Sequence, residues 1–121
     1  MDVLPRVCAA VALLVLDLVW IRLFMLPAYE RMVPRIQGAP LRVGARSAVA
    51  AYALMVVGQQ VFVLTHGDAQ RAFLFGIVLY GVYDATCAAI FDRWDPVLAL
   101  KDVLWGGTVY LASYGVATAV G

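Results

Sequence analysis

The feature that most constrains the fold is the stretch from residue 47 to residue 65, which carries no charged side chain. The hydrocarbon core of a bilayer is about 30 Å thick, and about 20 helical residues cross it. The stretch is therefore expected to form a transmembrane helix. Three further segments have a similar length and composition: residues 7–26, 72–91 and 97–120. The predicted fold class is all-α, an integral membrane four-helix bundle.

The composition excludes an ordinary soluble domain. Hydrophobic residues make up 64% of the 121 residues and charged residues 14%, with a mean hydropathy of +0.89. Soluble domains are nearer half apolar and a quarter charged, so lipid must be the solvent for most side chains. The four crossings leave room for one transmembrane domain, residues 1–121. The net charge is +1, and the charged residues are scattered along the chain, so they form no basic face for nucleic acid.

Pro27 is predicted to end the first helix, because proline cannot continue the backbone hydrogen-bond ladder. A basic loop, residues 27–46, follows it, and its residues 29–37 can form a short interfacial helix. Contact of this loop with anionic lipid headgroups is favoured over a specific phosphate site. The expected headgroup contacts are Arg31, Arg35, Arg42 and Arg46.

The distribution of Lys and Arg predicts the orientation in the membrane. The four arginines of the loop, with Arg93 in the turn after the third helix, outnumber Arg6 and Arg71 on the opposite face. Both loops are therefore expected in the cytoplasm. An even number of crossings places both termini on the same, non-cytoplasmic side. The first segment lacks a convincing cleavage site and is expected to be retained as a helix.

Three acidic residues lie inside the predicted helices, where a charge facing lipid at mid-bilayer costs at least about 2.5–3.5 kcal/mol. At about 1.5 Å of rise per residue, Asp17, Asp84 and Asp102 lie roughly 15, 12 and 9 Å from the cytoplasmic ends of their helices. They occupy one layer on three helices, so they are expected to turn inward and approach one another. Arg22 and Lys101, nearer the surface in the same half, are the expected charge partners.

Two of these acids have the same neighbour. Trp20 follows Asp17 by three residues, and Trp105 follows Asp102 by three. Residues at this spacing share a helix face. An indole N–H only donates hydrogen bonds, so each indole can bond a carboxylate on its own helix or on a facing helix.

The third acid has phenols beside it. Tyr80 lies four residues before Asp84 and shares its face. Tyr83 directly precedes this acid, and Thr86 follows it. The predicted ligand- or ion-binding residues are Asp17, Asp84, Asp102, Tyr80, Tyr83, Trp20, Trp105 and Thr86.

Other polar residues have structural interpretations. Gln59 and Gln60 are expected to bond to a neighbouring helix. His66 has nothing beside it with metal-ligand spacing, so a solvated loop residue is favoured over a metal ligand. Cys8 and Cys87 form no CxxC pair and fall toward opposite membrane faces, so no disulfide is expected. No metal or cofactor is predicted.

Small residues recur at four-residue steps in the last two helices, at 81, 85 and 89 and again at 113 and 117. Such stripes let helix backbones approach closely in a membrane. They are expected to form the close helix contacts of the bundle.

Three motifs resemble those of a known family: D-x-x-W at residues 17–20, Y-D-x-T at 83–86 and D-x-x-W-G at 102–106. The family is the domain-of-unknown-function family 2177, small predicted membrane proteins of bacteria and some large algal viruses. The resemblance covers nearly the whole chain. It implies a four-helix protein of the bacterial inner membrane or of a viral or host membrane, without an assigned activity. Cys87 stands where the family has an asparagine, which weakens any polar contact of that amide.

Three classes of function fit these residues. The first is an intramembrane carboxylate site for a proton, a cation or a small polar ligand. Four helices are few for a pore, so transport would imply a homo-oligomer. The second is a structural or assembly subunit of a larger membrane complex or viral membrane, in which the acids only fix helix packing. The third, a lipid-modifying enzyme, is disfavoured, because no Ser-His, Cys-His, HExxH or GxSxG pattern occurs.

Overall fold

The computed structural model describes residues 1–65 and 67–121, and every regular element in them is a helix. His66, expected as a solvated loop residue, lies outside the described residues. In chain order, with η for a π-helical segment, the elements are α1 (Val3–Trp20), η1 (Ile21–Met25), α2 (Leu26–Gln37), α3 (Ala45–Gly58), η2 (Gln59–Leu64), α4 (Ala69–Ile90) and α5 (Pro96–Val120).

Four continuous helices in the described part of the chain are long and apolar enough to cross a membrane, which confirms the predicted fold class. They are Val3–Gln37, Ala45–Leu64, Ala69–Ile90 and Pro96–Val120. Large apolar side chains such as Val15, Leu54 and Val78 are more than half exposed on them. Aspartate, glutamine and serine side chains are buried instead. This inverted distribution suits a lipid solvent.

The first helix does not stop at Pro27, as the sequence predicted. It is one continuous helix, Val3–Gln37. The π-helical segment Ile21–Met25 ends two residues before Pro27, and its wider turn makes room for the proline ring. Pro27 then sits in the first turn of α2, where its missing N–H is tolerated. Residues 29–37, expected as a separate interfacial helix, continue this rod, and only residues 38–44 of the basic segment are non-helical.

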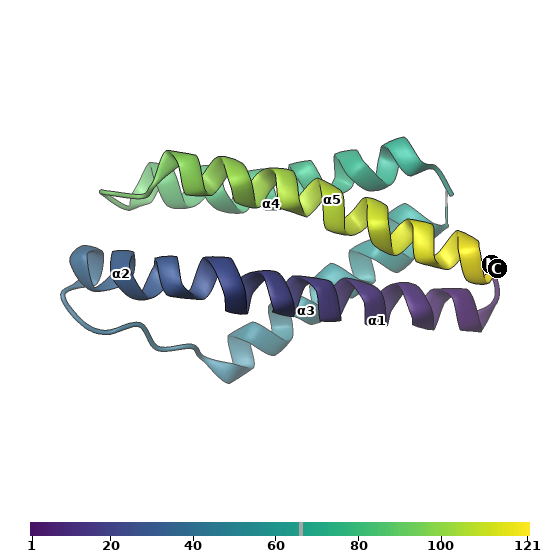
Figure 1. Ribbon diagram of the computed structural model, residues 1–121, viewed down its shortest axis with the longest axis horizontal. Helices are drawn as coiled ribbons and strands as arrows, with labels where there is room; N and C mark the ends of the chain where they lie inside the picture. Colours follow the sequence, from purple (N-terminus) through teal and green to yellow (C-terminus); the bar gives the residue numbers. More distant parts are fainter. Residues whose placement is uncertain (66) are drawn as a thin grey trace.

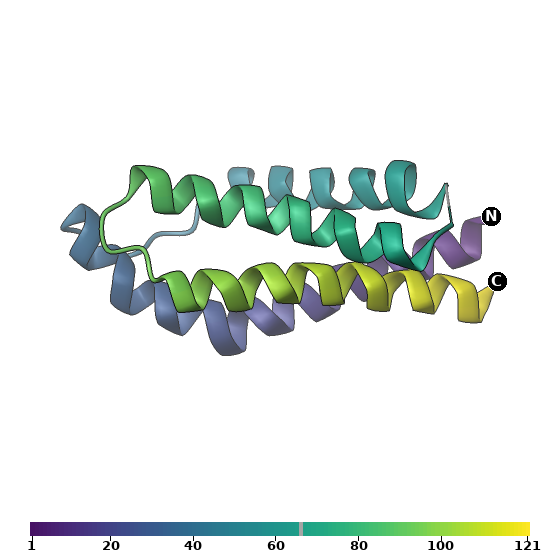
Figure 2. The same ribbon diagram turned by 90° about the horizontal axis from the view of Figure 1, so that it is seen from above.

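Helix α5 lies at the centre of the packing. Its contacts with α4 and α1 are the most extensive in the described chain. The α4–α5 hairpin lies along α1 and α2, and α3 crosses the bundle at an angle (Figure 1). The two termini lie at one end, with α2 and the α4–α5 turn at the other (Figure 2). The non-cytoplasmic location of the termini stays a prediction.

Glycine makes the close contact between α4 and α5. Gly76 of α4 lies directly against the backbone of Gly106 and Gly107 of α5. A Cβ atom on Gly76 would lie 2.0 Å from the Gly106 carbonyl oxygen and 2.8 Å from the Gly107 Cα. Backbone atoms cannot move aside as a flexible side chain can. The spacing of the two helices therefore depends on the absence of a side chain at Gly76.

The stripe of small residues at 81–89 does not make this contact, contrary to the expectation from the sequence. Ala85 and Ala89 are exposed. The inward stripe of α4 runs one residue earlier, through Tyr80 and Asp84. Each residue turns the helix by about 100°, so a shift of one position moves a stripe off the contact face.

The apolar core fills the half of the bundle nearer the termini. Ser113 and Ala117 of α5, the other expected stripe, are buried in this half. The core cluster consists of Ala9, Leu13, Val63, Leu64, Ala72, Val109, Tyr110 and Ala117. Asp17, Asp84 and Asp102 lie in the other half, nearer α2.

The variant Gly76→Ala tests the glycine contact. The added methyl group must push the α5 backbone away, so the free energy of unfolding is expected to fall by about 1–3 kcal/mol. Gly115→Ala is the matched control, because a Cβ there meets nothing within 4 Å. Unfolding in detergent, followed by circular dichroism, measures both variants. Equal stability of the two would contradict the close α4–α5 contact.

Candidate functional site

Asp17 is the most completely bonded acid of the bundle. Its side chain is 2% exposed. Its Oδ2 accepts a hydrogen bond from the Tyr52 hydroxyl at 3.0 Å. Its Oδ1 accepts from the Tyr80 hydroxyl at 2.5 Å and from the Trp105 Nε1 at 3.1 Å. The donors come from α3, α4 and α5, so this carboxylate on α1 joins all four spanning helices.

The two D-x-x-W motifs exchange partners across the antiparallel pair α1 and α5. Trp105 of α5 donates to Asp17, and Trp20 of α1 donates to Asp102 Oδ1 at 3.2 Å. The two indoles stack, with ring centroids 4.9 Å apart and planes 12° apart. Of the two partners that the sequence left open for each indole, the structure shows the facing helix. The reciprocal bonds set the register of α1 against α5.

Asp84 is buried without hydrogen bonds. Its side chain is 2% exposed, and neither carboxyl oxygen has a partner among the described residues. Its neighbours are the carboxyl group of Asp102, itself 5% exposed, and the indole of Trp94. Two ionised carboxylates are both acceptors, so they cannot hydrogen-bond to each other. A hydrogen bond between the two carboxyl groups therefore requires a proton on one of them. Otherwise a bound ligand must donate to them.

Trp94 covers this acid pair from the α4–α5 turn. Its ring lies 5.7 Å from that of Tyr29, 5.8 Å from that of Phe91 and 6.4 Å from that of Tyr83. These aromatic rings come from α2, α4 and the turn. They form a cap between the acid pair and the end of the bundle that carries the arginines.

The structure separates some of the predicted site residues from the acids. Tyr80 donates to Asp17 rather than to Asp84, the acid of its own helix. Thr86 is exposed, and so are Arg22 and Lys101, the expected charge partners. Among residues 1–65 and 67–121, no ion pair joins these two bases to an acid. Arg22 lies in η1 and Lys101 in α5, and long basic side chains of membrane helices can extend toward the headgroups.

The two glutamines bond across helices, as expected. Gln59 Nε2 donates to the Ala9 carbonyl oxygen and to Ser113 Oγ, each at 2.9 Å. Gln60 Nε2 donates to the Arg6 carbonyl oxygen at 3.1 Å. Both glutamines lie in η2, and these bonds attach it to α1 and α5. Cys8 and Cys87 are free thiols, as predicted.

Sequence reasoning missed two members of the site. Tyr52 was hidden in an apolar segment, although a phenol within an uncharged span is a signal that a hydrogen-bond acceptor lies nearby. Trp94 is the only aromatic residue in the polar turn of residues 92–96, and this contrast with its neighbours was the available signal. The described residues contain no cluster of three or more His, Cys, Asp or Glu side chains placed to hold a metal ion.

The family comparison agrees with this architecture. The model of the family described as "Predicted membrane protein (DUF2177)" matches residues 3–120. The chain belongs to this family. The DUF2177 description and the four candidate spans establish an integral membrane protein in a lipid environment. The kind of membrane stays a prediction. No curated protein and no solved structure matches the chain.

The variant Tyr80→Phe tests the bonding of Asp17. It keeps the ring against Gly106 but removes one donor from a buried carboxylate, so the free energy of unfolding is expected to fall by about 1.5–3 kcal/mol. Tyr114→Phe is the control, because its hydroxyl makes an exposed bond to the Gly67 carbonyl oxygen. Chemical unfolding in detergent compares them. A Tyr80→Phe protein as stable as the control would show that the bond to Asp17 contributes nothing.

Proposed function

We propose that the working site of this membrane protein is the pair Asp84 and Asp102, which takes up and releases a proton within the bilayer. The observation that carries the proposal is Asp84, a buried carboxyl group with no hydrogen-bond partner on either oxygen. Buried polar groups nearly always have partners, and exceptions call for an explanation. A proton shared with Asp102 supplies the missing bond.

The electrostatics favour a proton over two bare charges. Like charges on adjacent carboxyl groups disfavour joint ionisation, and burial disfavours it further. One proton on the pair removes one charge and creates a donor for the other carboxylate. A metal ion is the weaker candidate, because the described residues contain no group of three His, Cys, Asp or Glu side chains placed to hold one. The two carboxyl groups act as one titrating unit.

Asp17 has a different role in this proposal. Three donors already bond its carboxyl oxygens, so it is not the acid that lacks a hydrogen-bond partner. Its charge also acts on Asp102, which it can reach through the electrostatic field of the bundle interior. It is a positioning residue that holds the helices and sets the local field.

The structural or assembly role remains the second candidate, and the bonding of Asp17 favours it. A carboxylate that ties together donors from three other helices fixes a bundle in one register whether or not a proton moves. The two roles differ at Asp84. If Asp84 is purely structural, replacing its carboxyl group by a permanent hydrogen-bond donor should stabilise the fold. If Asp84 exchanges a proton, the same replacement should abolish function.

The variant Asp84→Asn tests whether the pair holds a proton. Its amide can donate to Asp102 without a proton, so the fold is expected to be retained. In isotope-edited infrared spectra, the wild-type protein should show a protonated carboxyl signal that this variant lacks. Asp92→Asn, in the exposed turn after α4, is the matched control. Absence of any protonated carboxyl signal in the folded wild-type protein would overturn the shared-proton proposal.

Transport is tested on the same proteins in vesicles. With an imposed pH gradient and an internal pH dye, the wild-type and Asp92→Asn proteins should dissipate the gradient, and Asp84→Asn should not. Equal rates in all three would exclude the pair as the path. A protonated pair without flux would leave the carboxyl site intact and support the structural role.

A further inference from the structure

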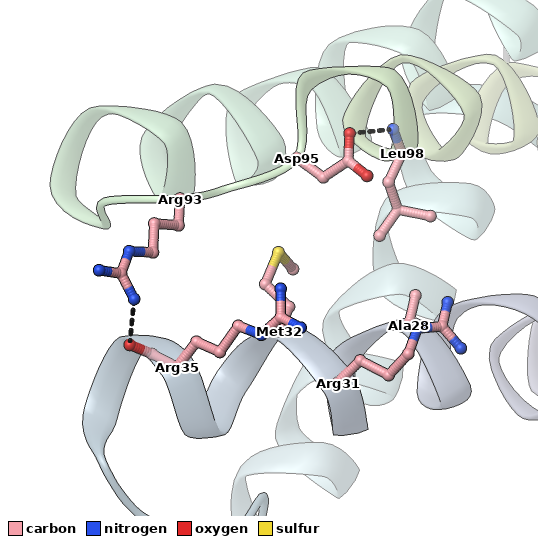
Figure 3. Close-up of a pocket in the computed structure, with 7 residues that line it drawn as sticks. All are labelled: Ala28, Arg31, Met32, Arg35, Arg93, Asp95 and Leu98. Atoms are coloured by element: carbon pink, nitrogen blue, oxygen red, sulfur yellow. Dashed lines mark hydrogen bonds between the residues drawn. The ribbon is translucent and has the colours of Figure 1, made fainter.

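A pocket lies at the end of the bundle away from the termini, between α2 and the turn that joins α4 to α5 (Figure 3). Its volume is about 360 Å³. Arg31, Met32 and Arg35 line it from α2, and Arg93 and Asp95 line it from the turn. Neither Asp84 nor Asp102 lines the pocket.

The positive charges of the pocket come from two segments far apart in the sequence. Arg93 reaches from the turn to α2, where its Nη1 donates to the Arg35 carbonyl oxygen at 3.4 Å (Figure 3). Arg93 has a φ of 64°, a left-handed conformation that is uncommon outside glycine. Arg93 therefore has a strained backbone conformation, and it is one of the residues that line the pocket.

The acid of the pocket does not neutralise these charges. Asp95 is the N-cap of α5, and its Oδ1 accepts hydrogen bonds from the Val97 and Leu98 backbone N–H groups. Among the described residues, no ion pair joins Asp95 or another acid to the three arginines. Three arginines and one carboxylate therefore line the pocket, which leaves an excess of positive charge there.

We propose that this pocket binds a phosphate group carried by an anionic ligand. Guanidinium groups match phosphate oxygens in charge and geometry, and they bind them with paired hydrogen bonds. The pocket lies at the end of a membrane-crossing helix, where headgroup phosphates are found. The phosphate therefore belongs to a lipid headgroup or to a soluble phosphate compound, two sources that share this chemistry.

An adjoining pocket favours the lipid source. It has a volume of about 390 Å³ and shares Arg35 and Arg93 with the first. Its lining adds the apolar side chains Ile36, Ile90 and Phe91 and the polar side chains Gln37 and Asp92. A headgroup phosphate at the arginines would leave the glycerol and upper acyl segments beside these three apolar side chains.

This assignment divides the four arginines of the basic segment. All four are exposed, but Arg31 and Arg35 line the pocket with Arg93, and Arg42 and Arg46 do not. The chain therefore provides its own control. A diffuse electrostatic attraction to lipid would use all these arginines alike, whereas a built pocket depends on the lining ones.

Binding is measured by calorimetry on the purified protein in an uncharged detergent at constant ionic strength. The probes are inorganic phosphate, short-chain phosphatidylglycerol and short-chain phosphatidylcholine. Binding of phosphatidylglycerol alone supports the pocket with a lipid source, and binding of inorganic phosphate supports it with a soluble source. Binding of no probe, or equal binding of the anionic and zwitterionic lipids, would overturn the proposal.

The double variant Arg35→Gln and Arg93→Gln should bind the preferred probe at least about tenfold more weakly, because charged hydrogen bonds are lost. The matched control, Arg42→Gln with Arg46→Gln, removes the same charge outside the pocket and should bind as the wild type does. Met32→Trp keeps every charge but fills the cavity, and it should also weaken binding. Equal losses in the control pair, or unchanged binding in Met32→Trp, would overturn the pocket. None of these changes touches the acid pair.

Discussion

A single buried charge sets the geometry of this bundle. Asp17 lies in a medium of low dielectric, where an ionised carboxylate is stable only when its oxygens are bonded. Tyr52, Tyr80 and Trp105 supply those bonds from three other helices. Helix α3 has few other contacts outside its η2 extension, so the Tyr52 bond and the bond from the Tyr110 hydroxyl to the Met55 carbonyl oxygen are a large part of what attaches it. A shift of any one of these helices by one residue would break a hydrogen bond and leave a carboxyl oxygen of Asp17 without a donor in the apolar interior.

The three acids look alike in the sequence and differ in the structure because of their donors. The D-x-x-W motif occurs on α1 and on α5, and the antiparallel packing of these helices lets each indole serve the carboxylate of the other. Helix α4 carries no such motif, and its tyrosine Tyr80 turns to Asp17. Asp84 is therefore left without a donor. This asymmetry between satisfied and unsatisfied acids is why the proposed proton site is placed at Asp84.

Much of this architecture follows from hydropathy alone. The uncharged run at 47–65 and the energetic penalty on Asp17, Asp84 and Asp102 predicted four spans with acids turned inward. The partners of those acids could not be predicted, because the register between helices depends on Gly76 and on the indole pairs, not on any one helix. The passage of the first helix through Pro27 was missed for a similar reason. A π-helical turn has no sequence signature as plain as the proline that it accommodates.

The continuous first helix has a mechanical consequence. Its 35 residues reach about 50 Å, which exceeds the roughly 30 Å of hydrocarbon that it crosses. A part of this rod must stand outside the oil or lean strongly within it. Asp17 lies on this same helix, four residues before the π-helical segment Ile21–Met25. Tilting the helix to fit the bilayer would therefore also change the position of Asp17 relative to the donors on the other three helices.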